Sequence, residues 1–280
     1  MIKLDSLIAS NEILFVGDLS ADLEYWRGLI RALAEYGNVS SPDLPGIGGM
    51  TSFYKIGKRP TLNNYADYLS SFVKMRYKRR RIVIVAVGFG FVIATRMLAN
   101  SPDIAKKVKL LVSLGGYADH EDFATSFSQK LTFRLLGRLY ANRIASAIIK
   151  LTVYNNSLIK MHYAHRFKAN KSLASKVLAS NELSRWKSSD MRTFGAISSE
   201  LMRFSNCAKR IVGVPTWHVF LNEKSLLRSR VEQHLKVIFE DLNITRANKK
   251  NLYALKQDKR TAAYFLPLKL RQQLRTLNER

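Results

Sequence analysis

The feature that most constrains this chain is an apolar run that leads directly into a helix. Residues 82–87 read Ile-Val-Ile-Val-Ala-Val, so they are apolar at every position and mostly β-branched. A strand without polar alternation is buried on both faces, which is typical of the centre of a parallel sheet. Gly88-Phe89-Gly90 follows, and apolar residues at helical spacing continue towards Pro102. This order of strand, glycine turn and helix predicts the start of a βαβ unit.

Strands and helices alternate on both sides of this run. The other predicted strands, the last of them weak, are residues 13–16, 108–114, 214–221 and 251–255. The other predicted helices, placed by the spacing of their apolar residues, are 21–36, 65–77, 230–240 and 266–277. Because helices separate the strands, we expect an α/β fold with a mostly parallel central sheet flanked by helices.

The middle of the chain follows a different pattern. From Tyr117 to Arg210 the strand signal disappears and helical spacing replaces it. We therefore expect a core made of residues 1–116 and 211–280, with a basic helical insertion at 117–210.

The charge is strongly basic and unevenly distributed. Lys and Arg number 46 against 21 Asp and Glu, which gives a formal net charge of +25. The excess lies in residues 74–81, in the middle region and in the tail from residue 246. In the first block the candidate anion-binding residues are Lys74, Arg76, Lys78, Arg79, Arg80 and Arg81. An anionic surface, either lipid or nucleic acid, is one interpretation, and a general excess of basic residues without a partner is the other.

A basic amphipathic stretch lies within the predicted insertion. From Gln129 to Leu151, Lys130, Arg134 and Arg138 repeat at helical spacing, and the leucines and isoleucines fall largely on another face. Such a helix can lie in a lipid interface. A helix that packs its apolar face on a protein core needs the same pattern, so both interpretations stay open.

Three stretches resemble the α/β-hydrolase family. Phe15-Val16-Gly17 with Trp26 downstream is similar to the family's His-Gly turn and following tryptophan. Residues 43–48, Asp-Leu-Pro-Gly-Ile-Gly, match its Asp-Leu-Pro-Gly-x-Gly loop, and the third stretch is the strand at 82–87 with its turn and helix. The resemblance covers residues 10–116 and 211–280. It implies an α/β-hydrolase fold in which residues 117–210 stand in the place of the variable cap.

Members of the family carry a catalytic triad of a nucleophile, an acid and a histidine. At the three corresponding positions this sequence has residues of other types. The family's nucleophile stands in a small-x-nucleophile-x-small turn, which Ala86-Val87-Gly88-Phe89-Gly90 matches with Gly88 at the nucleophile position. A second register would place Gly90 there, so the residue is a glycine in either case. By the same resemblance Ser225 stands at the acid position and Gln257 at the histidine position.

The expected cleft positions are Gly17, Asp18 and Phe89. Asp18 stands in the turn that normally helps to form the oxyanion hole, and a carboxylate there opposes the stabilisation of a developing negative charge. We therefore expect a hydrolase scaffold that has lost catalysis and binds a small apolar ligand or a protein partner. Two alternatives stay open: an active ester hydrolase with an unrecognised nucleophile, such as Ser113 or Cys207 or a site at Asp119-His120, and a basic protein associated with membranes or nucleic acid.

Cofactor and location signals are sparse. His162-x-x-His165 has no third ligand of suitable type close by, and Gly46-x-Gly48-Gly49 lacks the Lys-Ser/Thr of a phosphate-binding loop, so we expect no metal and no cofactor. The single cysteine, Cys207, favours a reducing compartment. No apolar run reaches the length of a transmembrane helix, and the N-terminus lacks a secretory pattern. We expect a cytoplasmic protein that can also lie at a membrane surface.

Overall fold

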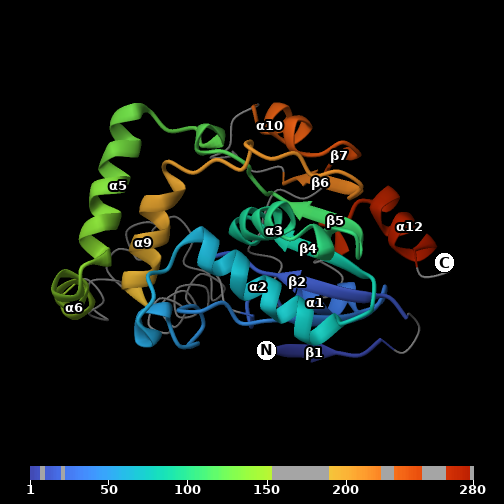
Figure 1. Cartoon of the computed structure of the whole chain (residues 1–280), viewed down its shortest axis with the longest axis horizontal. Coiled ribbons are helices and arrows are strands. Elements are labelled where there is room, and N and C mark those ends of the chain that lie inside the picture. The colour runs from blue at the N-terminus through green and yellow to red at the C-terminus, as the bar shows by residue number, and fades with distance from the viewer. Residues whose placement is uncertain (7–9, 20–22, 153–188, 222–229, 248–262, 278–280) are drawn as a thin grey trace, which may run out of the picture. The chain divides into compact units, whose positions relative to one another are not determined.

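The computed structural model describes residues 1–6, 10–19, 23–152, 189–221, 230–247 and 263–277 (Figure 1). The chain forms two compact units. The first unit comprises residues 1–43, 62–126 and 203–280, and the second comprises residues 44–61 and 127–202. The expected insertion at 117–210 overlaps the second unit, which also takes in the loop at 44–61.

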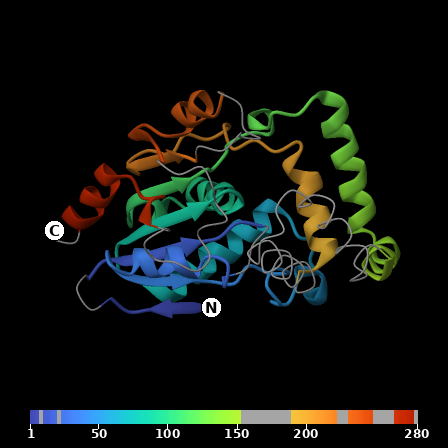
Figure 2. The same cartoon turned by 180° about the vertical axis from the view of Figure 1, so that it is seen from behind.

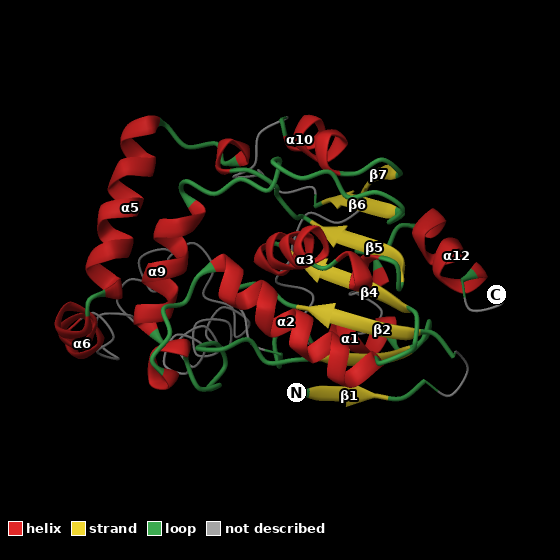
Figure 3. Cartoon of the chain, in the orientation of Figure 1, coloured by secondary structure: helices red, strands yellow, loops and turns green. Residues whose placement is uncertain are grey.

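A seven-stranded sheet forms the centre of the first unit (Figure 3). Its strands are β1 (Ile2–Leu4), β2 (Glu12–Val16), β3 (Asn38–Ser41), β4 (Ile82–Val87), β5 (Val108–Leu114), β6 (Thr216–Phe220) and β7 (Leu242–Arg246). Their order is β1-β3-β2-β4-β5-β6-β7, and only β1 runs antiparallel to its neighbour. The prediction of a mostly parallel α/β sheet is confirmed.

Helices cover both faces of this sheet. In the first unit they are α1 (Arg27–Leu33), α2 (Leu62–Tyr77), α3 (Phe89–Asn100), α4 (Pro102–Ala105), α10 (Val231–Ile238) and α12 (Leu268–Thr276). Alternate strand residues such as Val83 and Val85 share one core cluster with Leu29 of α1 and Leu270 of α12. Figure 2 gives the view from behind, in which α12 is the red helix that leads to the C-terminus. The other strand residues, such as the buried Ile84, are not part of this cluster and point to the opposite face of the sheet. Figure 1 shows α2 and α3 lying together along the sheet.

Three strands, β1, β3 and β7, were not predicted from the sequence. β1 and β3 are short, and β3 reads Asn-Val-Ser-Ser, so neither shows an apolar run. β7 alternates apolar and polar residues at the sheet edge, where one face stays accessible. The weak strand predicted at 251–255 lies outside the described residues.

The described part of the second unit is built from helices. It contains η1 (Phe53–Ile56), α5 (Phe127–Ala141), α6 (Arg143–Thr152) and α9 (Met191–Leu201). α5 approaches α9 closely, because a Cβ on Gly195 would lie 2.4 Å from the Cβ of Tyr140 and 2.7 Å from the carbonyl oxygen of Gly137. Glycines at the crossing therefore let the two backbones meet.

The prediction of one continuous helix from Gln129 to Leu151 is wrong. Asn142 separates two helices there, α5 and α6. The side-chain oxygen of Asn142 accepts the N–H groups of Ile144 at 2.9 Å and Ala145 at 3.2 Å. This N-cap satisfies the free donors at the start of α6 and begins a new helix there.

Among the described residues, no helix combines the length and apolar character that crossing a bilayer requires.

Replacing Gly90 should destabilise the first unit. A Cβ at this position would lie 2.4 Å from the carbonyl oxygen of Val16 and 2.5 Å from that of Gly17, and backbone atoms have little room to move. We expect Gly90→Ala to cost about 1–3 kcal/mol of unfolding free energy in urea titrations.

Thr95→Val on the same helix is the matched control. The buried Thr95 hydroxyl has no hydrogen-bond partner among the described residues, so its replacement by a methyl group should leave stability unchanged or raise it. Equal stability of Gly90→Ala and the wild type would show that α3 does not need this close approach.

Candidate functional site

A sharp turn joins β4 to α3 at the carboxyl edge of the sheet. β4 ends at Val87, α3 begins at Phe89, and Gly88 between them has φ 49° and ψ −114°. This backbone conformation strains any residue with a Cβ, and glycine adopts it at low cost. The local sequence therefore folds directly from a strand into a helix without an intervening loop.

The carboxylate of Asp18 occupies the space beside this turn. Its Oδ1 accepts a hydrogen bond from the Phe89 N–H at 2.7 Å. A Cβ on residue 88 would lie only 2.6 Å from the same oxygen and 3.0 Å from the Asp18 Cγ. Asp18 thus takes the donor at the start of α3 and fills the volume that a side chain at residue 88 would need.

The neighbouring expected cleft residues are closely packed. Phe89 is fully buried, and its ring meets the Tyr65 ring edge-on with centroids 5.3 Å apart. A Cβ on Gly17 would lie 3.0 Å from the indole of Trp26. The Phe89 ring consequently offers no open surface for a ligand.

A serine and a histidine meet inside the sheet. Ser113 of β5 and His218 of β6 are paired in register, and the serine Oγ lies 2.9 Å from the histidine Nδ1. Both residues are fully buried, and burial lowers the pKa of His218 to about 3. The ring is therefore neutral at physiological pH, and its Nε2 has no hydrogen-bond partner among the described residues. Because the pair is closed to solvent, a substrate cannot reach it.

This pair was not predicted, because His218 stands far from Ser113 along the chain. The two residues lie on separate predicted strands, and only the register between β5 and β6 brings them together. Only a correct prediction of the register between these two parallel strands would have placed Ser113 beside His218.

A second polar cluster follows β5. The buried carboxylate of Asp122 accepts the N–H groups of Ala118 at 2.7 Å and Asp119 at 3.0 Å, and its Oδ1 lies 2.6 Å from the Nδ1 of His234 on α10. Asp119 caps the short helix that begins at His120. These contacts tie the chain after β5 to α10.

Cys207 does not have the character of a reactive thiol. Burial raises the pKa of the Cys207 thiol, and the nearby carboxylates of Asp119 and Asp122 raise it further. A thiol that stays protonated at neutral pH is a poor nucleophile. Among the described residues, no three His, Cys, Asp or Glu side chains gather as a metal site.

Sequence comparisons find no relative. No protein-family model matches the chain, and no curated protein matches it.

Solved structures show clear similarity. An esterase from Thermogutta terrifontis aligns with a TM-score of 0.67 at 14% identity, over 99% of this chain and 93% of the esterase. MenH from S. aureus aligns with a TM-score of 0.66 at 11% identity, over 100% and 98%. The enol-lactonase from Burkholderia xenovorans LB400 aligns with a TM-score of 0.65 at 13% identity, over 98% and 96%.

This chain has the α/β-hydrolase fold. The fold implied by the three sequence stretches is confirmed. In α/β-hydrolases the nucleophile stands on a sharp strand-to-helix turn, and the N–H of the next residue helps to bind the oxyanion. The turn between β4 and α3 has this form, with Gly88 at its apex and the N–H of Phe89 after it. At these levels of identity the similarity establishes the fold and leaves the activity open.

The other two predicted triad positions cannot be placed around this turn. Ser225 and Gln257 both lie outside the described residues, so their assignment remains a prediction.

The basic block at 74–81 divides into two groups. Lys74 pairs with Asp103 at 3.4 Å, Arg76 donates from Nε to the Ser40 hydroxyl at 3.4 Å, and Arg80 pairs with the buried Glu12. All six cations are exposed, and the second group consists of Lys78, Arg79 and Arg81. Part of the block therefore ties α2 to its surroundings, and an anion-binding role of all six residues stays a prediction.

The buried His218 should make stability depend on pH. Its pKa is near 6.5 in the unfolded chain and about 3 in the folded one, so only the unfolded state takes up a proton as the pH falls through this window. The stabilisation is complete above pH 6.5 and is lost towards pH 3. Between pH 7 and about pH 4.5, the wild type should lose about 2–3 kcal/mol more than His218→Gln.

Urea unfolding at a series of pH values measures this difference. Ser113→Ala retains the buried ring and should keep the steeper pH dependence of the wild type. Parallel curves for the wild type and His218→Gln would show that the ring can be protonated in the folded protein.

Proposed function

We propose that this α/β-hydrolase-fold protein has lost hydrolase activity and acts as a binding protein. The observation that carries the proposal is the hydrogen bond from the Phe89 N–H to the Asp18 carboxylate. An active elbow keeps this donor for the oxyanion, and here an internal anion occupies it.

The residue at the apex of the turn supports the same conclusion. Gly88 offers no oxygen or sulfur, so it can form no covalent acyl intermediate. A side chain introduced there would collide with Asp18. Gly88 and Asp18 therefore fit each other, and together they remove both the attacking group and one oxyanion donor.

The remaining candidate nucleophiles do not replace the lost group. Ser113 is hydrogen-bonded to His218 inside the sheet, where no substrate reaches it. The thiol of Cys207 has a raised pKa. An Asp119-His120 site lacks a nucleophile of its own, since Asp119 serves as a helix cap.

Turnover of short- and medium-chain acyl esters, with labelling by an active-site-directed serine probe, tests the loss of catalysis. We expect no turnover above that of buffer and no labelled serine, because Gly88 supplies no nucleophile and the Ser113–His218 pair is buried.

Asp18→Asn and Ser113→Ala are the decisive variants if turnover is seen. Turnover abolished by Asp18→Asn would identify the Asp18 carboxylate as the nucleophile, and turnover abolished by Ser113→Ala would show that the buried pair opens to substrate. Either result would overturn the proposal.

A second candidate function is binding to an anionic lipid surface, because α5 and α6 expose an unusual amount of apolar surface. Eight of the exposed large apolar side chains among the described residues fall in this stretch, at Phe127, Leu131, Phe133, Leu135, Leu136, Leu139, Ile144 and Ile148. The first of them is 82% exposed. Contiguous exposed apolar patches mark interaction sites.

α5 contacts α9 through a face other than the one that carries its exposed leucines. Gly137 is buried at the crossing, and the carbonyl oxygen of Arg134 accepts a hydrogen bond from the Ser199 hydroxyl at 3.2 Å. Leu131, Leu135 and Leu139 lie one turn apart and are about half exposed, at 44%, 56% and 52%. The amphipathic pattern allowed a helix at a lipid interface or a helix packed on a protein core. The exposure of these leucines supports the lipid-interface interpretation.

The charge of the stretch favours lipid over other partners. Residues 127–150 contain Lys130, Arg134, Arg138, Arg143 and Lys150 and no acidic residue. Apolar side chains flanked by cations match the acyl and phosphate layers of an anionic membrane. Nucleic acid would use the cations and leave the leucines in water.

Cosedimentation with vesicles of phosphatidylglycerol and phosphatidylcholine tests this function. We expect Leu135→Ser/Leu139→Ser to weaken partitioning by about thirtyfold, since each half-exposed leucine loses about 1 kcal/mol of transfer free energy. Val237→Ser on α10 removes an apolar side chain of similar exposure, 54%, elsewhere and should change nothing. Partitioning of the leucine variant equal to that of the wild type would exclude these helices as the lipid-binding surface.

A further inference from the structure

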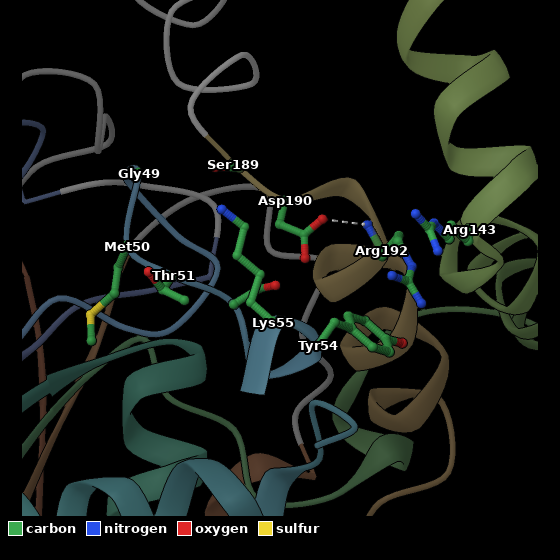
Figure 4. Close-up of a pocket in the computed structure, with 10 residues that line it drawn as sticks. Gly49, Met50, Thr51, Tyr54, Lys55, Arg143, Ser189, Asp190 and Arg192 are labelled. Carbon is green, nitrogen blue, oxygen red and sulfur yellow. Dashed lines mark hydrogen bonds between the residues drawn. The ribbon is translucent and has the colours of Figure 1, made fainter. Parts of the chain in front are cut away.

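The second unit contains a polar cavity that no part of the hydrolase scaffold explains. Its volume is about 530 Å³, within the usual range of small-molecule sites. The loop at 49–55 forms one side, and the first residues of α6 and the start of α9 form the rest (Figure 4).

Three cations line this cavity. They are Lys55 from the loop, Arg143 from α6 and Arg192 from α9. No carboxylate of the described residues lies within ion-pair distance of any of them. Cations that share a cavity repel one another, and a bound anion would relieve this repulsion.

Asp190, the carboxylate among the described lining residues, caps α9. Asp190 Oδ1 accepts the Arg192 N–H at 3.3 Å, which Figure 4 marks, and Oδ2 accepts the Thr193 hydroxyl at 2.7 Å. Its negative charge therefore serves the helix terminus. Among the described residues that line the cavity, three carry a positive charge and one carries a negative charge.

The guanidinium of Arg192 is held in place. Its Cζ lies 3.9 Å from the centroid of the Tyr54 ring, and its Nε donates to the carbonyl oxygen of Ala141 at 3.5 Å. A guanidinium that is stacked and hydrogen-bonded loses little entropy when it binds an anion. Tyr54 and Met50 add apolar surface to the same lining.

We propose that this cavity binds the phosphate group of a phosphorylated small molecule. The two guanidinium groups, of Arg143 and Arg192, match the charge and the oxygens of a phosphate dianion. The ammonium of Lys55 points to the other side of Asp190 in Figure 4 and adds to the positive potential of the cavity. The organic part of the ligand would lie against Tyr54 and Met50. This site is independent of the Gly88 turn and of any ester hydrolysis.

Isothermal titration of the full chain with sn-glycerol 3-phosphate at about 0.15 M salt tests the proposal, because this salt screens weak binding to the general positive charge. We expect saturable binding of one ligand per chain. Arg143→Gln should weaken it by about tenfold or more, since a charge-assisted contact is lost. Arg143 is exposed, so its replacement should leave folding intact.

Lys58→Gln is the matched control, because Lys58 is an exposed cation that follows the same loop and does not line the cavity. Its affinity should equal that of the wild type. An equal loss of affinity in Lys58→Gln and Arg143→Gln would mean that the affinity depends only on the net charge of the protein. This result would overturn the proposal.

The phosphate can belong to a free molecule or to a lipid headgroup, and vesicles of phosphatidic acid distinguish the two. Binding of the vesicles, but not of glycerol phosphate, with dependence on Arg143 identifies a headgroup site. Arg143-dependent binding of glycerol phosphate identifies a site for a free ligand. Failure of both probes, or binding that Arg143→Gln does not change, refutes the phosphate site.

Discussion

The central strand β4 is buried on both faces, and the architecture of the first unit depends on it. None of its residues is more than 4% exposed, so an apolar layer has to cover each side. Parallel neighbours satisfy its backbone, and helices on both faces supply the layers. The parallel order gathers the carboxyl ends of the strands at one edge, which is where ligands usually bind in such sheets.

The same parallel pairing explains how Asp18 reaches Gly88. β2 and β4 are neighbours, with Val16 paired to Ala86, so the residues that follow the two strands emerge side by side. In an active hydrolase this arrangement brings an oxyanion donor to the nucleophile. Here it brings a carboxylate to a glycine, and the helix N–H that it accepts is satisfied within the protein. The turn thus keeps the geometry of the fold, and an internal hydrogen bond satisfies the donor at the start of α3.

The cations of this chain lie in several different environments. Arg80 balances the buried Glu12 at the sheet, and Lys74 pairs with Asp103 on the surface, so part of the block at 74–81 is structural. On α5 and α6 the cations accompany exposed leucines, and in the second unit Lys55, Arg143 and Arg192 line a cavity. Net charge alone would not have separated these three environments.

The sequence by itself determined the fold class, because the apolar run at 82–87 and its neighbours encode buried strands through local hydrophobicity. It also indicated Gly88 and Asp18 as the residues of interest, through a resemblance whose fold the structure confirms and whose site assignments remain predictions. Only the tertiary structure decided which distant residues meet, such as Ser113 with His218, since strand register depends on partners far apart in the chain. It also decided which apolar side chains stay exposed, because an amphipathic pattern is the same whether its apolar face meets protein or water.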